Sequence, residues 1–461
     1  MRALLAGLAL PSLWDWRWIT TALVFAVSYF VGRFYQRVSK YPRGPFPLPL
    51  VGNLLSLRKV SLPTKASEWS KVYGDVFTLW MSHRPMVFLN SYGVIREAFL
   101  DHRHEFAGRF PTKMGAVQNQ GNHDIMFEDY NPRWKALRKV ALLAVRKYAV
   151  SEPLEKLCTD VVDSYVDSLK EGPQLVESRE PFLHILFTLI TVSVYGTTVE
   201  EAKKDVKHME EINRKFFEIA PDGLPSDVAP WLGILYRRRE KAIERIFHES
   251  FEFLSKLFSA AEATYAPGKT ENFTHAMLSA REDAIREEKG DAEYLTKGNM
   301  VQVLVNIFGA ATDTSAGELQ WLFLMMAKEP WIQEKIKKEI EDNIGELEIP
   351  KDTGIIFNAY GVNHDPKLWD EPEKFRPERF LDPVAGKLRR DPLPLVTFGM
   401  GPRTCPGEKL AHMDMFYILV RLLQRLSVSA GEKPPNVDAC GFGSNIFMLP
   451  AKQTITLTKS N

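Results

Sequence analysis

The chain is poor in cysteine and carries almost no net charge. Only three cysteines occur in 461 residues, and they lie far apart, at Cys158, Cys405 and Cys440. No Cys-x-x-Cys pair exists, which excludes a disulfide framework and a zinc knuckle and favours a reducing compartment that faces the cytosol. Lys plus Arg number 59 and Asp plus Glu number 58, a formal net charge of +1. We therefore expect no nucleic-acid partner, although a local basic face is compatible with this balance.

Internal repeats, low-complexity tracts and linkers are also lacking from Asn53 onwards. With 45% hydrophobic and 25% charged residues, the chain can bury a large core. Two predicted strands, 74–80 and 85–90, flank a turn, and helical periodicity dominates from Tyr92 onwards. The predicted helices cover residues 94–100, 132–145, 153–169, 182–195, 199–219, 231–260, 272–286, 299–328 and 408–425. The pattern favours one large, mainly α-helical domain with a small β part over residues 53–461.

Residues 1–40 have the pattern of a membrane anchor with a basic flank. Residues 18–32 are free of charge and lie between Arg17 and Arg33. This run is shorter than the ~20 residues of a standard spanning helix, but Trp14 and Trp16 could extend it at the interface. No small-residue cleavage site follows, and most basic residues come after the run. We expect an uncleaved anchor with the body in the cytosol; a buried core helix is the alternative.

A proline-rich hinge follows the anchor, at residues 41–52. Five of the ten residues 41–50 are Pro or Gly, which excludes a helix and favours a stiff, extended connector. Such a spacer would fix the tilt of the body on the bilayer.

The longest apolar helical pattern, residues 299–328, contains four consecutive polar residues, 312–315. Ala310 and Thr314 are four apart and share a face, and Ala311 lies beside them. This face is small enough for a flat ligand to approach the helix backbone. Alternatively, the hydroxyls bond to carbonyls one turn earlier and kink the helix. The pattern alone leaves both interpretations open.

The loop around Cys405 is the most informative segment. Three glycines and two prolines surround the cysteine: Gly399, Gly401, Pro402, Pro406 and Gly407. The glycines permit unusual backbone angles and close approach to a ligand. Pro406 suits the first position of a helix, which would put Cys405 at a helix N-terminus and favour thiolate over thiol. Arg403 suits a carboxylate such as a heme propionate. A metal-bound thiolate and a nucleophilic cysteine both fit this pattern; a dinucleotide loop lacks its third glycine.

Four segments, in order, resemble the cytochrome P-450 superfamily. Phe398-x-x-Gly401-x-Arg403-x-Cys405-x-Gly407 resembles its heme-binding signature. Trp134 and Arg138 resemble the pair that contacts the heme propionates, residues 310–314 resemble the oxygen-activation motif, and residues 375–380 resemble the motif before the heme loop. The resemblance covers nearly the whole chain. The anchor, the strand pair and residues 105–109 look most like microsomal animal members that hydroxylate drugs and steroids.

The resemblance implies a heme-thiolate monooxygenase that uses O2. Cys405 would be the axial thiolate ligand of heme b iron, and Asp313 and Thr314 would relay protons to the bound oxygen. The other implied cofactor-binding residues are Trp134, Arg138, Ala310, Phe398, Gly399, Arg403 and Gly407. The resemblance also implies a single-anchor protein of the endoplasmic reticulum membrane.

The implied electron donor is an NADPH-dependent flavoprotein reductase in the same membrane. The reductase would dock on a basic face of this chain, on the thiolate side, for which Lys135, Lys139 and Lys409 are candidates; each of them also suits a plain solvated surface position. The implied substrate is small and lipophilic, in an apolar pocket lined by Phe308, Ala310 and residues 442–447, although aromatic residues at such spacing also suit a plain core.

Two departures from the superfamily pattern stand out. Ala311 replaces a usual glycine, which we expect to tune rather than abolish activity. The Glu-x-x-Arg helix that should contact Arg379 is missing, because the sequence passes from one helix to a much later strand at Gly345/Glu346. Glu373 and Arg376 have the spacing of a Glu-x-x-Arg motif, but the prolines on both sides of them exclude a helix at this place.

We therefore expect an internal deletion near 345/346 and a form that binds heme poorly, as from a skipped exon or a faulty gene model. Two other functions stay open. One is a heme-thiolate isomerase or dehydratase, which Asp313 and Thr314 disfavour. The other is a catalytically impaired isoform that only binds the reductase or another partner.

Overall fold

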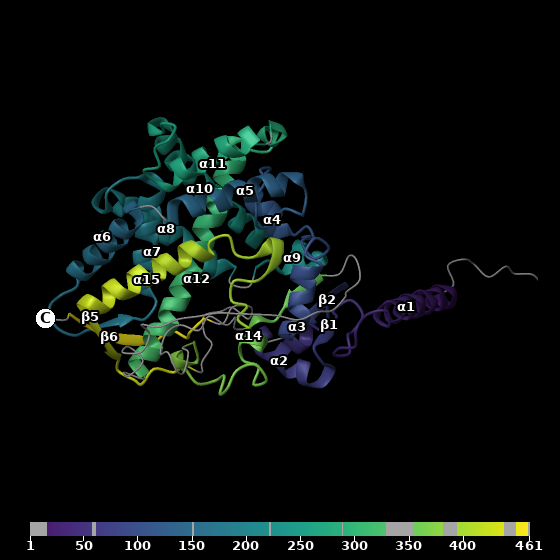
Figure 1. Cartoon of the computed structure of the whole chain (residues 1–461). Coiled ribbons are helices and arrows are strands. Elements are labelled where there is room, and N and C mark those ends of the chain that lie inside the picture. Colours follow the sequence, from purple (N-terminus) through teal and green to yellow (C-terminus); the bar gives the residue numbers. More distant parts are fainter. Residues whose placement is uncertain are drawn as a thin grey trace, which may run out of the picture.

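The computed structural model describes residues 16–57, 61–149, 152–220, 223–287, 289–328, 354–380, 394–437 and 449–459. Long helices form most of the molecule, and two small sheets lie at its lower edge in Figure 1. The mainly α-helical fold with a small β part, predicted from the sequence, is confirmed.

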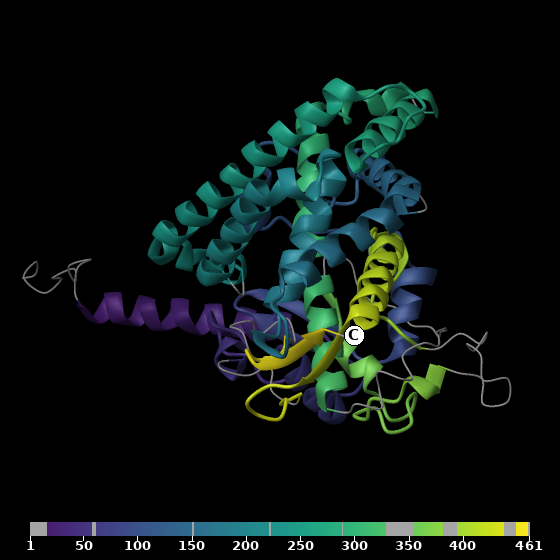
Figure 2. The ribbon, with the colours of Figure 1, turned by 90° about the vertical axis from the view of Figure 1, so that its left-hand side faces the viewer.

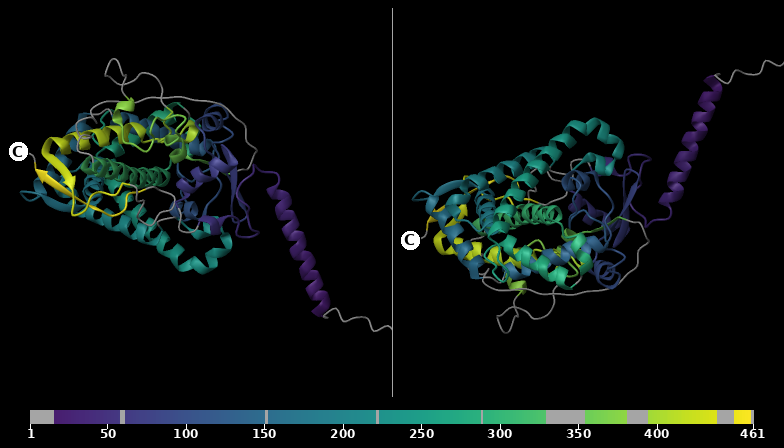
Figure 3. Two further views of the ribbon diagram at one scale, coloured as in Figure 1. Left: turned by 90° about the horizontal axis from the view of Figure 1, so that it is seen from below. Right: turned by 90° about the horizontal axis from the view of Figure 1, so that it is seen from above.

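One large hydrophobic core joins the long helices. These are α5 (Pro132–Ala149), α6 (Glu152–Ser168), α7 (Glu180–Tyr195), α8 (Val199–Ile219), α10 (Gly233–Thr264), α11 (Phe273–Glu287), α12 (Lys297–Lys328) and α15 (Glu408–Arg425). α12 runs through the middle of the helical part, between α10 and α15 (Figures 2 and 3). Because neighbours cover α12 on several sides, it is apolar on most faces, as its sequence indicates.

Local sequence signals fix several helix ends. Thr198 and Glu201 form a reciprocal capping box at the start of α8, which satisfies backbone N–H groups that the helix leaves free. Gly196 ends α7 in the left-handed conformation, at φ +72°, where a glycine has no steric penalty. The predicted bounds of α8 and α15 agree with the structure, whereas α5 continues to residue 149 and α10 lies a few residues later than predicted.

Shorter helices surround the bundle. They are α2 (Leu62–Tyr73), α3 (Tyr92–Arg96), α4 (Lys113–Asn119), α9 (Pro225–Val228) and α14 (Ala359–Asn363). The predicted helix 94–100 is corrected: α3 ends at Arg96, and a π-helical turn follows over Glu97–Asp101.

The predicted strand pair is present as a hairpin of β1 (Val76–Met81) and β2 (Arg84–Leu89), to which β4 (Gly354–Phe357) adds in parallel. A second sheet pairs β3 (Gln174–Glu177), β6 (Thr454–Lys459) and β5 (Leu426–Ala430), all antiparallel. The sequence prediction missed this sheet because its strands are short and lie far apart along the chain.

The N-terminal helix α1 (Trp16–Val38) extends away from the body (Figures 1 and 3). Its residues 18–38 are apolar and long enough to cross a membrane by length and composition. The hinge that follows is extended and bound to the first sheet: Asn53 donates to the carbonyls of Pro45 and Phe46 and accepts from the Trp80 N–H. The hinge is therefore attached to the body and is not a loose tether.

Candidate functional site

The Cys405 loop is built by close backbone contacts. The short 3-10 turn η6 (Gly401–Arg403) precedes the cysteine, and the Cys405 N–H donates to the Phe398 carbonyl at 2.8 Å. Gly401 has φ +70°, and a Cβ there would lie 2.0 Å from the Phe99 carbonyl oxygen. Only glycine fits this position. α15 begins at Glu408, where the helical pattern predicts its start, with Gly407 as its N-cap; Pro406 therefore lies two residues before the helix and not at its first position.

The surroundings of Cys405 act on the pKa of its thiol in opposite directions. Burial raises the pKa of the half-buried thiol, while backbone N–H groups of Gly407 and Glu408 and the Arg138 guanidinium oppose that rise. The backbone N–H groups at the helix start and the Arg138 cation thus favour the thiolate, while burial opposes it. A coordinated metal ion deprotonates a ligating thiol outright, so the loop is suited to a ligand that carries its own positive charge.

Three arginines form a cluster beside this loop: Arg138, which is buried, Arg403, which is half-buried, and Arg109. Arg138 on α5 donates to the Thr404 carbonyl. Burial lowers the pKa of Arg403 to about 9, and the neighbouring cations Arg109 and Arg138 lower it further. Burial likewise lowers the pKa values of Arg109 and Arg138. Cations that repel one another in a buried place favour an anionic ligand.

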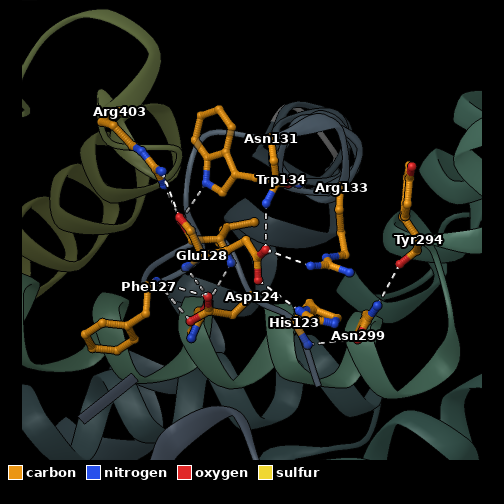
Figure 4. A network of polar contacts seen from close by, with 12 residues as sticks. His123, Asp124, Phe127, Glu128, Asn131, Arg133, Trp134, Tyr294, Asn299 and Arg403 are labelled. Carbon is orange, nitrogen blue, oxygen red and sulfur yellow. Dashed lines mark hydrogen bonds and ion pairs between the residues drawn. The ribbon is translucent and has the colours of Figure 1, made fainter. Parts of the chain in front are cut away.

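The donors of Trp134 and Arg403 meet at the carbonyl of Ile125 (Figure 4). Trp134 donates its indole N–H to that oxygen at 3.1 Å, and Arg403 Nη1 lies 3.3 Å from it. The remaining Arg403 donors go to the carbonyls of Ala107 and Glu128, at 2.8 Å each. The guanidinium also lies 4.0 Å from the centre of the Trp134 ring. The structure thus brings these two predicted cofactor residues together but pairs their donors with backbone carbonyls.

Sequence reasoning missed the loop that supplies these carbonyls. Asp124 accepts the N–H groups of Phe127 and Glu128 and holds the loop in a turn. From α12, Asn299 accepts the N–H of His123 at 2.9 Å, and Asn306 accepts that of Ile125 at 3.1 Å (Figure 4). Polar residues at positions 299 and 306, seven apart on an apolar helix, were the available signal.

The predicted small face of α12 is open, since Ala310 and Thr314 are both exposed. The Thr314 hydroxyl donates to the Ala310 carbonyl at 2.7 Å, and Thr312 does the same to Phe308 at 2.9 Å. The back-bonding interpretation of these hydroxyls is therefore confirmed, and it coexists with an open face.

Asp313 turns toward α7 and α8. Its Oδ1 lies 2.7 Å from Arg179 Nη2 and 3.3 Å from Asn213 Nδ2. Burial raises the pKa of Asp313, and the Arg179 cation and Asn213 oppose the rise. The carboxyl is thus held by a buried ion pair one residue away from Thr314.

Phe308 is buried and packs 6.0 Å from Phe187, centre to centre, and it lines a small internal cavity of about 30 Å³. In the described part of the chain this residue thus has a core position. The other predicted pocket segment, residues 442–447, and the Gly345/Glu346 junction lie outside the described residues.

The sequence matches the model of the cytochrome P-450 family over residues 42–348 and 341–457. The chain belongs to the cytochrome P-450 family. Cytochrome P-450 1A1 of Pleuronectes platessa is 27% identical over 467 aligned residues, covering 88% of this chain and 89% of the relative. Cytochrome P-450 1A3 of Oncorhynchus mykiss is 26% identical, covering 90% of each.

Solved structures show the same fold. A zebrafish cytochrome P-450 described with progesterone has a TM-score of 0.71 at 21% identity, covering 86% of this chain and 99% of that one. Cytochromes P-450 are heme-thiolate monooxygenases that use O2, with a cysteine thiolate on the heme iron. The residues of this chain fit heme, because a half-buried thiol lies beside an arginine cluster suited to two propionates.

Replacing Arg403 with methionine is expected to destabilise the fold by about 3 kcal/mol. The change leaves the Ala107 and Glu128 carbonyls without this donor, at about 1–3 kcal/mol per unsatisfied buried group. Urea unfolding followed by tryptophan fluorescence measures the loss. Arg376→Met is the control, because its pairs with Asp370 and Glu371 are exposed and contribute less than about 1 kcal/mol. Equal losses for both variants would contradict the role of the Arg403 carbonyl contacts.

Proposed function

We propose that this cytochrome P-450 inserts one oxygen atom from O2 into a lipophilic organic substrate, with Cys405 as the axial heme ligand. The observation that carries the proposal is the juxtaposition of the Cys405 thiol with Arg138, whose guanidinium binds the adjoining Thr404 carbonyl. Heme, when bound, supplies the oxygen activation, and electron density from the thiolate favours O–O cleavage.

The residues of the chain would bind and orient the heme and carry protons to the site. Arg138 and Arg403 would hold the propionates, with Trp134 stacked beside them at 5.4 Å and 4.0 Å from their guanidinium carbons to its ring centre. The exposed face at Ala310 and Thr314 would admit the flat cofactor to the α12 backbone. Gly399 at φ +72° and Phe398 would shape the loop beneath it. Asp313 would carry protons to the Thr314 side of the site by leaving Arg179.

The membrane assignment rests on exposed apolar surface. α1 is exposed along its apolar length, and a second exposed group precedes the Arg237–Arg238–Arg239 run: Trp231, Ile234 and Leu235. Both suit a bilayer interface. We place the protein in the endoplasmic reticulum membrane with a single N-terminal anchor and the body in the cytosol.

The electron donor is proposed to be an NADPH-dependent flavoprotein reductase. A cavity of about 670 Å³ opens between α5 and the heme loop. Its basic lining residues are Arg103, His104, Lys135, Arg138, Lys139 and Arg146, and none of its described lining residues is acidic. Lys135 is exposed, as is Lys409 on α15, while Lys139 pairs with Glu287 at 2.9 Å. A basic surface on the thiolate side suits an acidic partner, with Lys135 and Lys409 better placed than Lys139.

Asp313→Asn is expected to lower turnover on the order of 10²-fold, the contribution of a general acid. Asn213→Ala is the matched control, because it removes the other Asp313 partner on α8 and leaves the carboxylate in place. Product formation and NADPH oxidation are measured together with purified reductase, and melting temperatures show whether loss of the Arg179 pair unfolds the variant. Turnover without NADPH would instead indicate the isomerase, and equal rates in a folded Asp313→Asn variant would remove Asp313 from the reaction.

A second function, that of a partner-binding form with impaired catalysis, is favoured by the sequence comparisons. The family match falls into two pieces that meet at residues 341–348, where we expect the internal deletion. The alignment with the Pleuronectes platessa relative has 467 positions, whereas 88% of 461 residues supplies about 406 of them. About 60 positions of that alignment thus have no residue in this chain. The guanidinium of Arg379, which the resemblance would pair with the Glu-x-x-Arg helix, donates to the nearby backbone carbonyls of Asp370, Glu371 and Lys374.

A further inference from the structure

A small internal cavity of about 30 Å³ lies in the helical core, away from the arginine cluster. It is enclosed by α5, α6, α7, α11, α12 and α15. Its lining includes Ala311 on α12 and Leu410 on α15, so it lies between the helix of the oxygen-activation motif and the helix that follows Cys405. Most of the lining is apolar, but three side chains are polar: Tyr148, Ser193 and Asp414.

Asp414 is a buried acid with one oxygen that no described group of the chain pairs with. The residue is 6% exposed, and its Oδ1 has no hydrogen-bond partner among the described residues. No cation of the described chain lines the cavity either. An unpartnered buried acceptor costs about 1–3 kcal/mol and an uncompensated buried charge costs more. A molecule in the cavity that forms a hydrogen bond with Asp414 Oδ1 would offset this cost.

We propose that the cavity is a binding site for one or two water molecules, held by Asp414 as a neutral carboxylic acid together with Tyr148 and Ser193. A water needs roughly 10–15 Å³ of such space and 2–4 polar partners, and this cavity offers both. Tyr148 and Ser193 already share a side-chain hydrogen bond, which leaves further donor and acceptor capacity on the two hydroxyls.

Other occupants fit less well. A divalent cation wants six or more oxygen ligands, and one carboxyl with two hydroxyls does not supply them. An apolar molecule would leave the Asp414 oxygen unpaired. A small neutral molecule that both donates and accepts hydrogen bonds, as water does, satisfies all three side chains.

The surroundings keep Asp414 protonated near neutral pH. Burial raises the pKa of Asp414 to about 8. Burial also raises the pKa of Tyr148, and the nearby Asp414 and Cys158 add to that rise while Ser193 opposes it. The lining residues of α6, α7, α11 and α12 that the structure describes carry no titratable group. None of these described lining residues therefore supplies a positive charge that would stabilise the ionised form.

This acid makes stability fall as pH rises. Below about pH 4 an aspartate is protonated in both the folded and the unfolded chain. Between about pH 4 and 8 the unfolded chain releases the proton and the folded chain keeps it, so the folded state loses stability. Above about pH 8 both states are ionised and the loss is constant.

Asp414→Asn tests the neutral acid in the purified full chain. The variant keeps a donor and an acceptor for water but cannot ionise. We expect its advantage in the folding equilibrium over the parent to grow by up to tenfold per pH unit between pH 5 and 8, and then to level off. Asp163→Asn is the control on the neighbouring α6, where Arg421 lowers the pKa of Asp163, and it should lose stability at neutral pH. A pH-independent difference for Asp414→Asn would overturn the neutral acid.

The water itself is tested by infrared difference spectra of the parent minus Asp414→Asn, and by a high-resolution crystal structure. A protonated carboxyl band at the frequency of a hydrogen-bonded acid, or an ordered water within hydrogen-bond distance of Oδ1, supports the site. The frequency of a free acid, a carboxylate band at pH 6, or a protein group bonded to Oδ1 overturns it. Both readouts are independent of heme content, so failure of the proposed monooxygenase function does not decide them.

Discussion

Replacing Cys405 with serine is expected to abolish the thiolate-type spectrum of the reduced, CO-bound protein. Serine keeps the size and the backbone contacts of the loop, including the 2.8 Å bond from the N–H of residue 405 to Phe398. It removes the sulfur that donates electron density to the iron. We expect no detectable thiolate Soret band and a fall in monooxygenase turnover below detection.

Cys158→Ala is the matched control. Cys158 is a fully buried cysteine on α6, in the hydrophobic core and outside the heme loop. Its replacement should cost a little stability, as small buried cavities do, and leave the position of the Soret band unchanged. If the thiolate spectrum survives Cys405→Ser but is lost on Cys158→Ala, then Cys158 is the heme ligand and the assignment of Cys405 is wrong.

Inserting a Glu-x-x-Arg segment at the proposed deletion site, Gly345/Glu346, is expected to raise the heme content per chain at least tenfold. The family's Glu-x-x-Arg helix supplies a carboxylate for the arginine that matches Arg379, and breaking such a buried pair costs about 3–5 kcal/mol. That is a large part of the ~5–15 kcal/mol that stabilises a domain. Insertion of the corresponding segment of the Pleuronectes platessa relative, followed by heme quantification per milligram of purified protein, measures the gain.

An equally long Gly/Ser insertion at the same junction is the control, because it adds length without the helix or its glutamate. We expect no gain from it. If the chain without any insertion incorporates heme fully and gives a thiolate spectrum, the deletion has no effect on heme binding and the impaired-isoform proposal fails. If the chain without an insertion takes up too little heme for a spectrum, Cys405→Ser is compared with its parent in the chain that carries the inserted segment.

Much of the fold could be predicted because its long elements carry strong periodic signals. α8 and α15 agree with their predicted bounds, and the β1–β2 hairpin follows the prediction of two strands around a turn. The second sheet could not be predicted, since β3 pairs with β6 across almost 300 residues and each strand is only 4–6 residues long. Such short segments have little local signal, and their pairing depends on the bundle around them.

For the candidate site, too, some features could be predicted from the sequence and others could not. Gly401 is required by its local backbone, so the loop sequence alone indicated a close contact, and the structure supplies the Phe99 carbonyl as its cause. The burial of Cys405, which raises the pKa of its thiol, could not be predicted from the sequence, because burial depends on packing that no local pattern records. The Ile125 carbonyl, shared by Trp134 and Arg403, belongs to a loop whose sequence looks unremarkable and whose position depends on distant asparagines of α12.

The junction between anchor and body bears on how the protein can be prepared in solution. Phe34 and Tyr41 each lie 5.4 Å from the Trp80 ring centre, and Arg37 lies over the same ring at 5.4 Å. A protein shortened to begin at Tyr41 would lose Phe34 and Arg37 and uncover one face of a tryptophan that is 1% exposed in the full chain. A protein that begins at Arg33 would lack most of the apolar helix but keep Phe34 and Arg37 over Trp80. We expect it to aggregate less than the protein that begins at Tyr41.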